Sequence, residues 1–156
     1  MKKILFATFL LICFIALAIV FFSPPKKSVE IEFFTPDNQV ITKLSAPIAD
    51  SNKERQTGLM FRDSLPNDEG LLFVFNGFQK HAMWMKNMRF PIDLIFLDEK
   101  KDIIKIYENL PPCETLDCPS YPSEKPAVYA IEMNSGYIAN HQITSNTKIY
   151  FDIDKK

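Results

Sequence analysis

Glycine is scarce in this chain, and neither sign of charge is in excess. Only four glycines occur among the 156 residues, and they form no glycine-rich phosphate-binding loop. Strand-like runs do not alternate with long helical ones, so the sequence does not predict a nucleotide-binding α/β sheet. The formal net charge is −1, which gives no sign of the basic surface that nucleic-acid binding usually requires. We therefore expect no nucleic-acid partner.

Only one long hydrophobic run is present, at the N-terminus. Residues 4–22 are apolar apart from Thr8, and at a helical rise of ~1.5 Å per residue they would span the hydrocarbon core of a membrane. Pro24 and Pro25 would end that helix. Residues 16–18, Ala-Leu-Ala, could form a cleavage signal, but the apolar run continues beyond them. We favour an uncleaved signal anchor within residues 1–27, with the domain outside the cytoplasm, over a removed signal peptide and a secreted domain.

Cysteine and histidine are also few, at three and two residues. Cys113 and Cys118 lie in the proline-rich stretch PPCETLDCPSYP, and in an exported domain such a pair indicates a local disulfide. The alternative is a zinc site, for which only His81 and His141 could supply further ligands. We favour the disulfide, and we expect no metal and no cofactor.

Residues 28–156 form one predicted domain, made mostly of short strands. Residues 29–33 alternate apolar and acidic side chains, and the run PIDLIFLD, residues 91–98, is apolar on both faces and predicts a central strand. Ser51 and Glu54 have the spacing of a capping box, which predicts a short helix over residues 51–60. About seven strands with one or two short helices predict a mainly β (α+β) fold. We expect a small, curled antiparallel or mixed sheet, or a barrel-like domain, behind an N-terminal transmembrane helix.

Two connections stand out in this domain. Asn76-Gly77 predicts a turn after the strand-like run LLFVF. Residues 110–126 contain no periodic segment and exceed the usual length of a connection, which makes them a candidate binding loop.

Several motifs taken together resemble a known family. ERQTGLMFR, EGLLFVF, MWMKNMRFPIDLIFLD, PPC…C…Y and YAIEMNSGY occur in the order and spacing of the domain of unknown function 192 family, over residues 29–153. The resemblance implies a small β-rich domain, often behind a signal peptide or membrane anchor, whose biochemical function is not established. The matching positions are Arg55, Gly58, Leu59, Met60, Arg62, Gly70, Trp84, Met85, Lys86, Asn87, Asp93, Cys113, Cys118, Tyr121, Glu132 and Gly136. The chain departs from the pattern at Met83 and Met88, where an aromatic residue and threonine are more usual.

Trp84 is the only tryptophan and has two interpretations. A buried core residue is the one we favour for a lone tryptophan, because its large apolar surface stabilises a small domain. The other is a platform for a sugar ring or another flat ligand. Lys86 would share its strand face, and an ammonium in a core must reach solvent, pair with an acid or border a pocket.

Structural and functional interpretations must also be weighed for the charged residues Asp93, Glu132 and Arg62. Asp93 enters an apolar strand and needs charged partners or several donors, for which Arg55 is the first candidate and Lys86 the second. This pair could fix the helix to the sheet, or Asp93 could be an acid in a pocket. Glu132 could belong to the site or face water. Arg62, predicted on the helical face of Arg55, most simply reads as solvated surface.

These observations lead to three functional hypotheses. The first is a membrane-anchored, extracytoplasmic binding or accessory module for a small molecule, such as a carbohydrate or another cell-envelope component. Its polar pocket would be lined by Arg55, Trp84, Lys86, Asn87, Asp93, Tyr121 and Glu132. The second is a hydrolase-like enzyme that uses the carboxyl groups of Asp93 and Glu132. The third is a Cu(I)-handling domain that uses His81, Met83 and Met85. We favour the first, because no complete catalytic constellation is visible.

Overall fold

The computed structural model describes residues 27–154. The predicted membrane anchor, residues 4–22, lies outside this described part. Within the described residues, no helix has both the length and the apolar character needed to cross a membrane.

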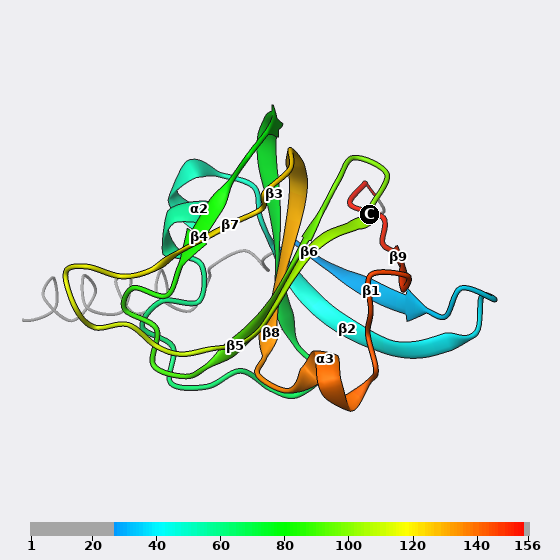
Figure 1. The fold of residues 1–156 in the computed structure, drawn as a ribbon, viewed down its shortest axis with the longest axis horizontal. Coiled ribbons are helices and arrows are strands. Elements are labelled where there is room, and N and C mark those ends of the chain that lie inside the picture. Colours follow the sequence, from blue (N-terminus) through cyan, green and yellow to red (C-terminus); the bar gives the residue numbers. More distant parts are fainter. Residues whose placement is uncertain (1–26, 155–156) are drawn as a thin grey trace, which may run out of the picture.

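Short strands make up most of the described chain (Figure 1). The strands are β1 (Ser28–Phe34), β2 (Val40–Ala49), β3 (Gly70–Gln79), β4 (Ala82–Trp84), β5 (Ile92–Leu97), β6 (Ile103–Leu110), β7 (Ser120–Pro122), β8 (Ala127–Asn134) and β9 (Lys148–Tyr150), and the helices are α2 (Asn52–Thr57) and α3 (Tyr137–Asn140). The prediction of a mainly β domain with short helices is confirmed.

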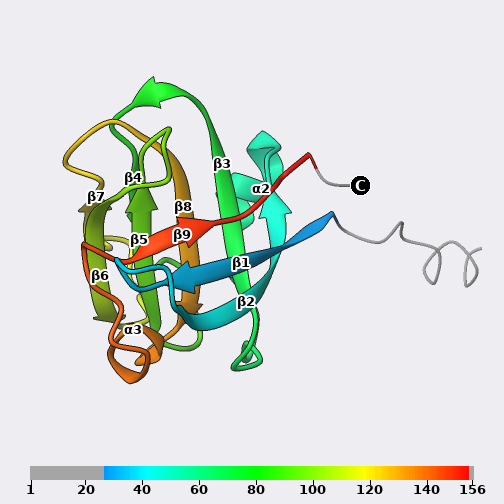
Figure 2. The ribbon, with the colours of Figure 1, turned by 90° about the vertical axis from the view of Figure 1, so that its right-hand side faces the viewer.

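One mixed sheet carries the fold, in the order β6-β5-β8-β3-β2-β1-β9. Its pairs are antiparallel except for β2 and β3, which run parallel where Ile48 faces Leu72. The sheet curls into a half-barrel, so that β1 and β2 lie across from β5 and β6 (Figure 2). The short strands β4 and β7 form a separate two-stranded sheet. In Figure 1, α2 and β4 lie at the same end of the molecule, and Figure 2 shows that they are apart in depth.

The central strand was predicted correctly. All six residues of β5 are buried, and the strand lies between β6 and β8. Its side chains alternate between two hydrophobic cores, one on each face of the sheet. Ile95 faces the barrel core, which the curled sheet encloses, and Leu94 faces the site-side core, towards α2 and β4. A strand with both faces covered must be apolar throughout, as this sequence is.

Helix α2 begins as predicted but ends earlier. The Ser51 hydroxyl accepts a hydrogen bond from the Glu54 backbone N–H, and the Glu54 carboxylate in turn accepts from the Ser51 N–H, which completes the capping box. Gly58 ends the helix with φ of 48°, and Phe61 also has a positive φ, of 65°. Arg62 is exposed but lies beyond the helix, so the prediction that it shares a helical face with Arg55 is wrong.

Both predicted connections contain strand structure. Asn76 and Gly77 lie within β3, although Gly77 has the positive φ, 82°, that a turn would need. Residues 110–126 include β7, which pairs with β4 so that Met83 is opposite Tyr121. β7 has only three residues, which is too short for the two-residue alternation of a strand to be recognised from sequence.

Gly70 permits the close pairing of β3 and β8. A Cβ atom at this position would lie 2.7 Å from the backbone oxygen of Glu132 and 2.5 Å from Leu44 Cδ2. We therefore expect Gly70→Ala to lower the free energy of unfolding by roughly 1–3 kcal/mol, because the two strands must move apart. Thermal unfolding followed by circular dichroism measures this loss. A variant as stable as the wild type would show that β3 and β8 can accommodate the added methyl group without loss of stability.

Candidate functional site

A cavity of about 720 Å³, called here the site cavity, lies between α2, the outer end of β3 and the segment that includes β4. Small-molecule sites usually have volumes of about 300–1,000 Å³. Five of the seven predicted ligand-binding residues line it: Arg55, Trp84, Lys86, Asn87 and Glu132.

Glu132 is the acidic residue of this cavity. It lies on β8 opposite Leu71 of β3 and Leu94 of β5, and only 4% of its surface is exposed. Its Oε2 atom has no hydrogen-bond partner among the described residues. Burial raises the pKa of Glu132 to about 8, and the positive charge of Arg62 partly opposes that rise. The carboxyl group is therefore mainly protonated at neutral pH, and it lines the cavity with one buried oxygen atom unpaired among the described residues.

His81 supplies a second buried polar atom without a partner. Its Nε2 atom forms no hydrogen bond within the described part of the chain, while its ring stacks on Phe75 with the ring centres 3.9 Å apart. Burial lowers the pKa of His81, a hydrogen bond with the backbone of Gly77 partly opposes this, and the charge of Arg55 lowers the pKa further. The neutral imidazole is thus favoured in the wall of the cavity.

Arg55 is held in place, but not by the predicted partner. Its guanidinium donates to the backbone oxygens of Asp50 and Val74, the latter at 2.9 Å, and to Asn52 Oδ1 at 2.6 Å. The prediction that Arg55 pairs with Asp93 is wrong. Because its acceptors are uncharged oxygens, Arg55 forms no ion pair among the described residues, and its charge is available to the cavity.

Trp84 borders the site cavity and is not a core residue. Half of its surface, 50%, is exposed, which contradicts the interpretation that we favoured from sequence. The Lys86 Nζ atom lies 5.2 Å from the centre of a Trp84 ring, within the range of a cation–π contact. Trp84 is exposed because β4 belongs to the small flanking sheet and buries little of its surface.

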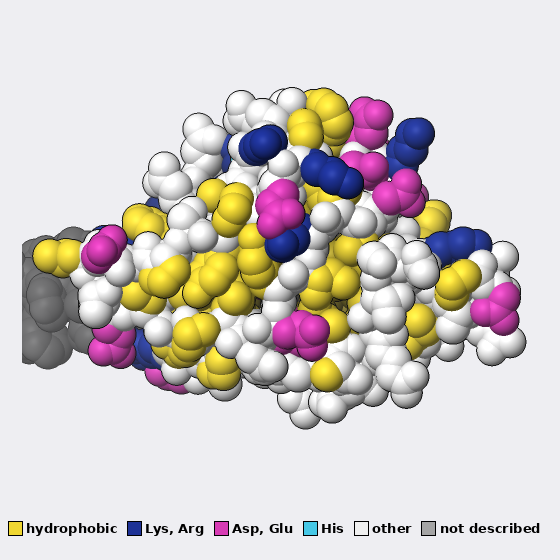
Figure 3. All heavy atoms as spheres, in the orientation of Figure 1, with side chains coloured by type: hydrophobic (Ala, Val, Ile, Leu, Met, Phe, Trp, Pro, Cys, Tyr) yellow, Lys and Arg dark blue, Asp and Glu magenta, His cyan; other side chains and the backbone are white. Residues whose placement is uncertain are grey.

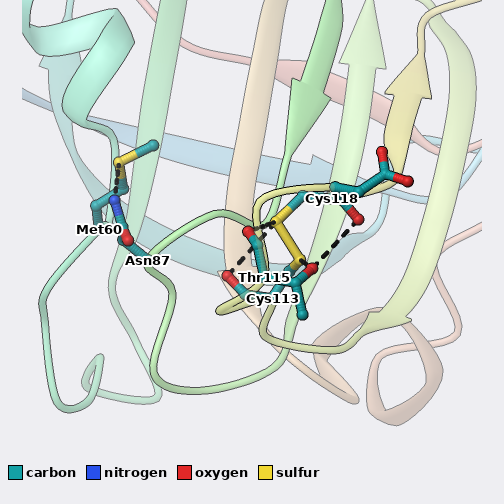
Figure 4. The surroundings of a disulfide bond; sticks show 6 residues. Met60, Asn87, Cys113, Thr115 and Cys118 are labelled. Carbon is teal, nitrogen blue, oxygen red and sulfur yellow. Dashed lines mark hydrogen bonds between the residues drawn. A yellow bond between two sulfur atoms is a disulfide. The ribbon is translucent and has the colours of Figure 1, made fainter.

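The segment after β4 is held by the disulfide loop. Cys113 and Cys118 form a disulfide with Cα atoms 5.8 Å apart. The Cys113 backbone N–H donates to the Met85 oxygen, and the Cys113 oxygen accepts from the Asn87 N–H. Figure 4 shows the Asn87 side chain beside Met60 and away from the disulfide, and its amide nitrogen lies 3.9 Å from the sulfur of Met60. Asn87 has a positive φ of 58°, which turns the chain along the cavity.

Asp93 and Tyr121 do not line the site cavity, contrary to the prediction. Asp93 is fully buried, and its two carboxyl oxygens accept hydrogen bonds from the backbone N–H groups of Asn109 and Ile138, both at 2.9 Å. It pairs in register with Met133, a residue of the barrel core. Tyr121 instead packs edge-on against Tyr107, with ring centres 5.5 Å apart.

Several lining residues were not foreseen from sequence. They are amide side chains from α2 and the outer end of β3, and sulfur-containing or aromatic side chains in the wall: Asn52, Gln56, Asn76, Gln79, Phe73, Phe75 and Met88. Single amides near a helix start or a turn carry no pattern that marks them as site residues. The alternation in LLFVF could have placed Phe73 and Phe75 on one face.

The surface outside the cavity carries charges of both signs. On the face shown in Figure 3, acidic and basic side chains of the described residues are interspersed with hydrophobic ones. The ion pairs Lys43–Glu30 and Lys105–Glu124 are examples, with N···O distances of 2.9 and 2.5 Å.

The fold is shared with solved structures. A proposed transcription regulator from Sinorhizobium meliloti is 25% identical, with a TM-score of 0.74, and the match covers 83% of this chain and 97% of that one. A protein of unknown function from Novosphingobium aromaticivorans is also 25% identical, with a TM-score of 0.72 and coverages of 82% and 89%. No curated protein matches the chain. The family model DUF192, described as "Uncharacterized ACR", matches residues 32–151. The chain therefore belongs to the domain of unknown function 192 family.

Proposed function

We propose that this chain is a membrane-anchored binding module that holds a small molecule or cell-envelope component in the site cavity, outside the cytoplasm. The length and apolar character of residues 4–22 support the anchor. The Cys113–Cys118 disulfide supports an oxidising compartment, since such bonds are rare in the cytosol.

One observation carries the binding function. Two buried polar atoms, Glu132 Oε2 and His81 Nε2, have no hydrogen-bond partner among the described residues, and both residues line one cavity. Buried polar groups are almost always satisfied, and each one left unsatisfied costs about 1–3 kcal/mol. A ligand that completes these hydrogen bonds would recover that cost. In a cavity that binds nothing, two unsatisfied polar groups would only destabilise the fold.

The half-exposed Trp84 supports the same function. A large aromatic side chain at the rim of a concave polar site offers a flat apolar surface to a ligand. The rigid backbone around it, fixed by the disulfide loop, lowers the entropy cost of forming the site.

The two alternative functions lack the necessary geometry. Leu94 lies opposite Glu132 and Asp93 opposite Met133, so the two carboxyl groups point to opposite faces of the sheet. They cannot flank one sugar bond.

For Cu(I), His81 and Met83 line the cavity, but Met85 is 2% exposed and packs in the site-side core. Balanced charge likewise argues against the nucleic-acid role that the description of the Sinorhizobium meliloti protein would imply.

A screen of small molecules against the full-length chain in phosphatidylcholine vesicles tests the proposal. We expect hits to raise the unfolding temperature of the wild type, because a ligand that binds only the folded state stabilises it. Trp84→Ala should lose this response and Phe78→Ala should keep it. Phe78 is the matched control, because its aromatic ring is 60% exposed but does not line the cavity. Hits that stabilise Trp84→Ala as much as the wild type would refute the site.

A further inference from the structure

We infer that the site cavity selects a small organic carboxylate whose apolar body packs beside Trp84. This inference rests on the proposed function and adds the chemical class of the ligand. Charge, hydrogen bonding and the composition of the wall each contribute to it.

Positive charge dominates the site cavity. Arg55 and Lys86 line it, and neither forms an ion pair within the described residues. Glu132 is the only acidic side chain in the described lining, and Arg62 also acts on it from beyond α2. The residues opposite Glu132 on β3 and β5, Leu71 and Leu94, carry no charge. With Glu132 protonated, the cavity attracts an anion and repels a cation.

Glu132 adds a specific donor for such an anion. A protonated carboxyl group carries one O–H donor, and its buried oxygen has no partner among the described residues. Because its pKa is raised to about 8, the group keeps this proton at neutral pH. A carboxylate oxygen of the ligand is a strong acceptor for it, and hydrogen bonds to a charged acceptor are the stronger kind. Lys86 can supply the opposite charge from the rim.

The rest of the wall requires an apolar body on the ligand. Its hydrophobic members come from the helix exit, from β3 and from the segment around β4: Leu59, Met60, Phe73, Phe75, Met83 and Met88. A small inorganic anion would leave this surface unfilled in a cavity of about 720 Å³. An uncharged sugar would use the amides and Trp84 but not the charge of Lys86.

The emission of Trp84 provides a direct test, since it is the only tryptophan in the chain and borders the cavity. The full-length chain in phosphatidylcholine vesicles is titrated with cyclohexanecarboxylate, cyclohexanecarboxamide and methyl glucoside. These probes share a six-membered ring and differ in charge and polarity. We expect the carboxylate to bind roughly tenfold or more tightly than its amide, as one charge-assisted hydrogen bond implies.

Two further measurements separate charge from shape. Lys86→Gln should weaken carboxylate binding by roughly tenfold and amide binding by much less, because the amide loses no charge pair. Lys100→Gln is the matched control, because Lys100 is exposed in the turn between β5 and β6, away from the cavity. Carboxylate binding should also weaken as the pH rises through about 8, when Glu132 ionises, and Glu132→Gln should flatten this pH profile.

The outcomes distinguish the ligand class from the site itself. Equal or tighter binding of the amide or of methyl glucoside would overturn the carboxylate inference and leave the binding function standing. A Lys86→Gln variant that binds carboxylate as tightly as the wild type would also overturn it. If none of the three probes changes the Trp84 emission, the cavity is not a small-molecule site, and the proposed function fails with the inference.

Discussion

Asp93→Ala is expected to lower the free energy of unfolding by about 2–4 kcal/mol, because it removes the acceptor of two backbone N–H groups. One of them, that of Ile138, lies in the first turn of α3, where Gly136 provides no side-chain cap. Asp93 therefore caps this helix from a distant strand and also holds the end of β6 through Asn109. The loss is measured by thermal unfolding of the full-length chain, followed by circular dichroism.

Asp98→Ala is the matched control for this experiment. Asp98 also accepts two backbone N–H bonds, from Lys100 at 2.8 Å and Asp102 at 2.9 Å, but in an exposed turn. Water can replace that acceptor, so we expect a loss of about 1 kcal/mol or less. If Asp93→Ala kept the wild-type stability and lost ligand binding, Asp93 would instead be a site residue.

Glu132→Gln is expected to change how stability depends on pH. The pKa of Glu132 is about 8 in the folded chain and 4.5 for an ordinary glutamate. Below the lower value both states are protonated, and between the two values only the unfolded state ionises. The wild type therefore loses stability as the pH rises towards 8. At about 1.4 kcal/mol for each pKa unit, the variant should gain about 3–5 kcal/mol over the wild type between pH 4 and pH 9.

Unfolding of both proteins at a series of pH values measures this difference. The glutamine amide leaves its own polar atoms buried, which adds an offset that does not depend on pH. The diagnostic quantity is therefore how the difference in stability between the variant and the wild type changes with pH. The difference measured at pH 4 serves as the reference. Parallel stability curves from pH 4 to pH 9 would show that Glu132 ionises in the folded chain as it does in water.

The strands of the main sheet could be predicted because each has a clear hydrophobic pattern, either alternating or apolar throughout. The apolar residues on both faces of β5 required two covered faces, and the structure provides two cores. The capping box likewise marked the start of α2. Its end was missed because Gly58 and Phe61 turn the chain with positive φ, and Phe61 carries no sequence signal for this.

The candidate site was predicted only in part, and the errors have physical causes. The donors to Asp93 are backbone N–H groups, 16 and 45 residues away in the chain, which leave no mark in the side-chain sequence. Trp84 lines the cavity as the predicted pocket required, but the expectation that it is buried was wrong, because the burial of a strand depends on which sheet it joins. Glu132 alternates with apolar neighbours as a surface residue would, but it lies on a strand that is covered on both faces.

The disulfide loop has a consequence for how relatives of this protein could diversify. No residue from 110 to 126 lines the site cavity, yet Cys113 is bonded through its backbone to Met85 and Asn87. A change of length or sequence between the two cysteines would displace the backbone at Met85 and Asn87, and with it the cavity wall, while every side chain that lines the cavity stays the same. The shape of the cavity can thus change through a segment that contributes no side chain to it.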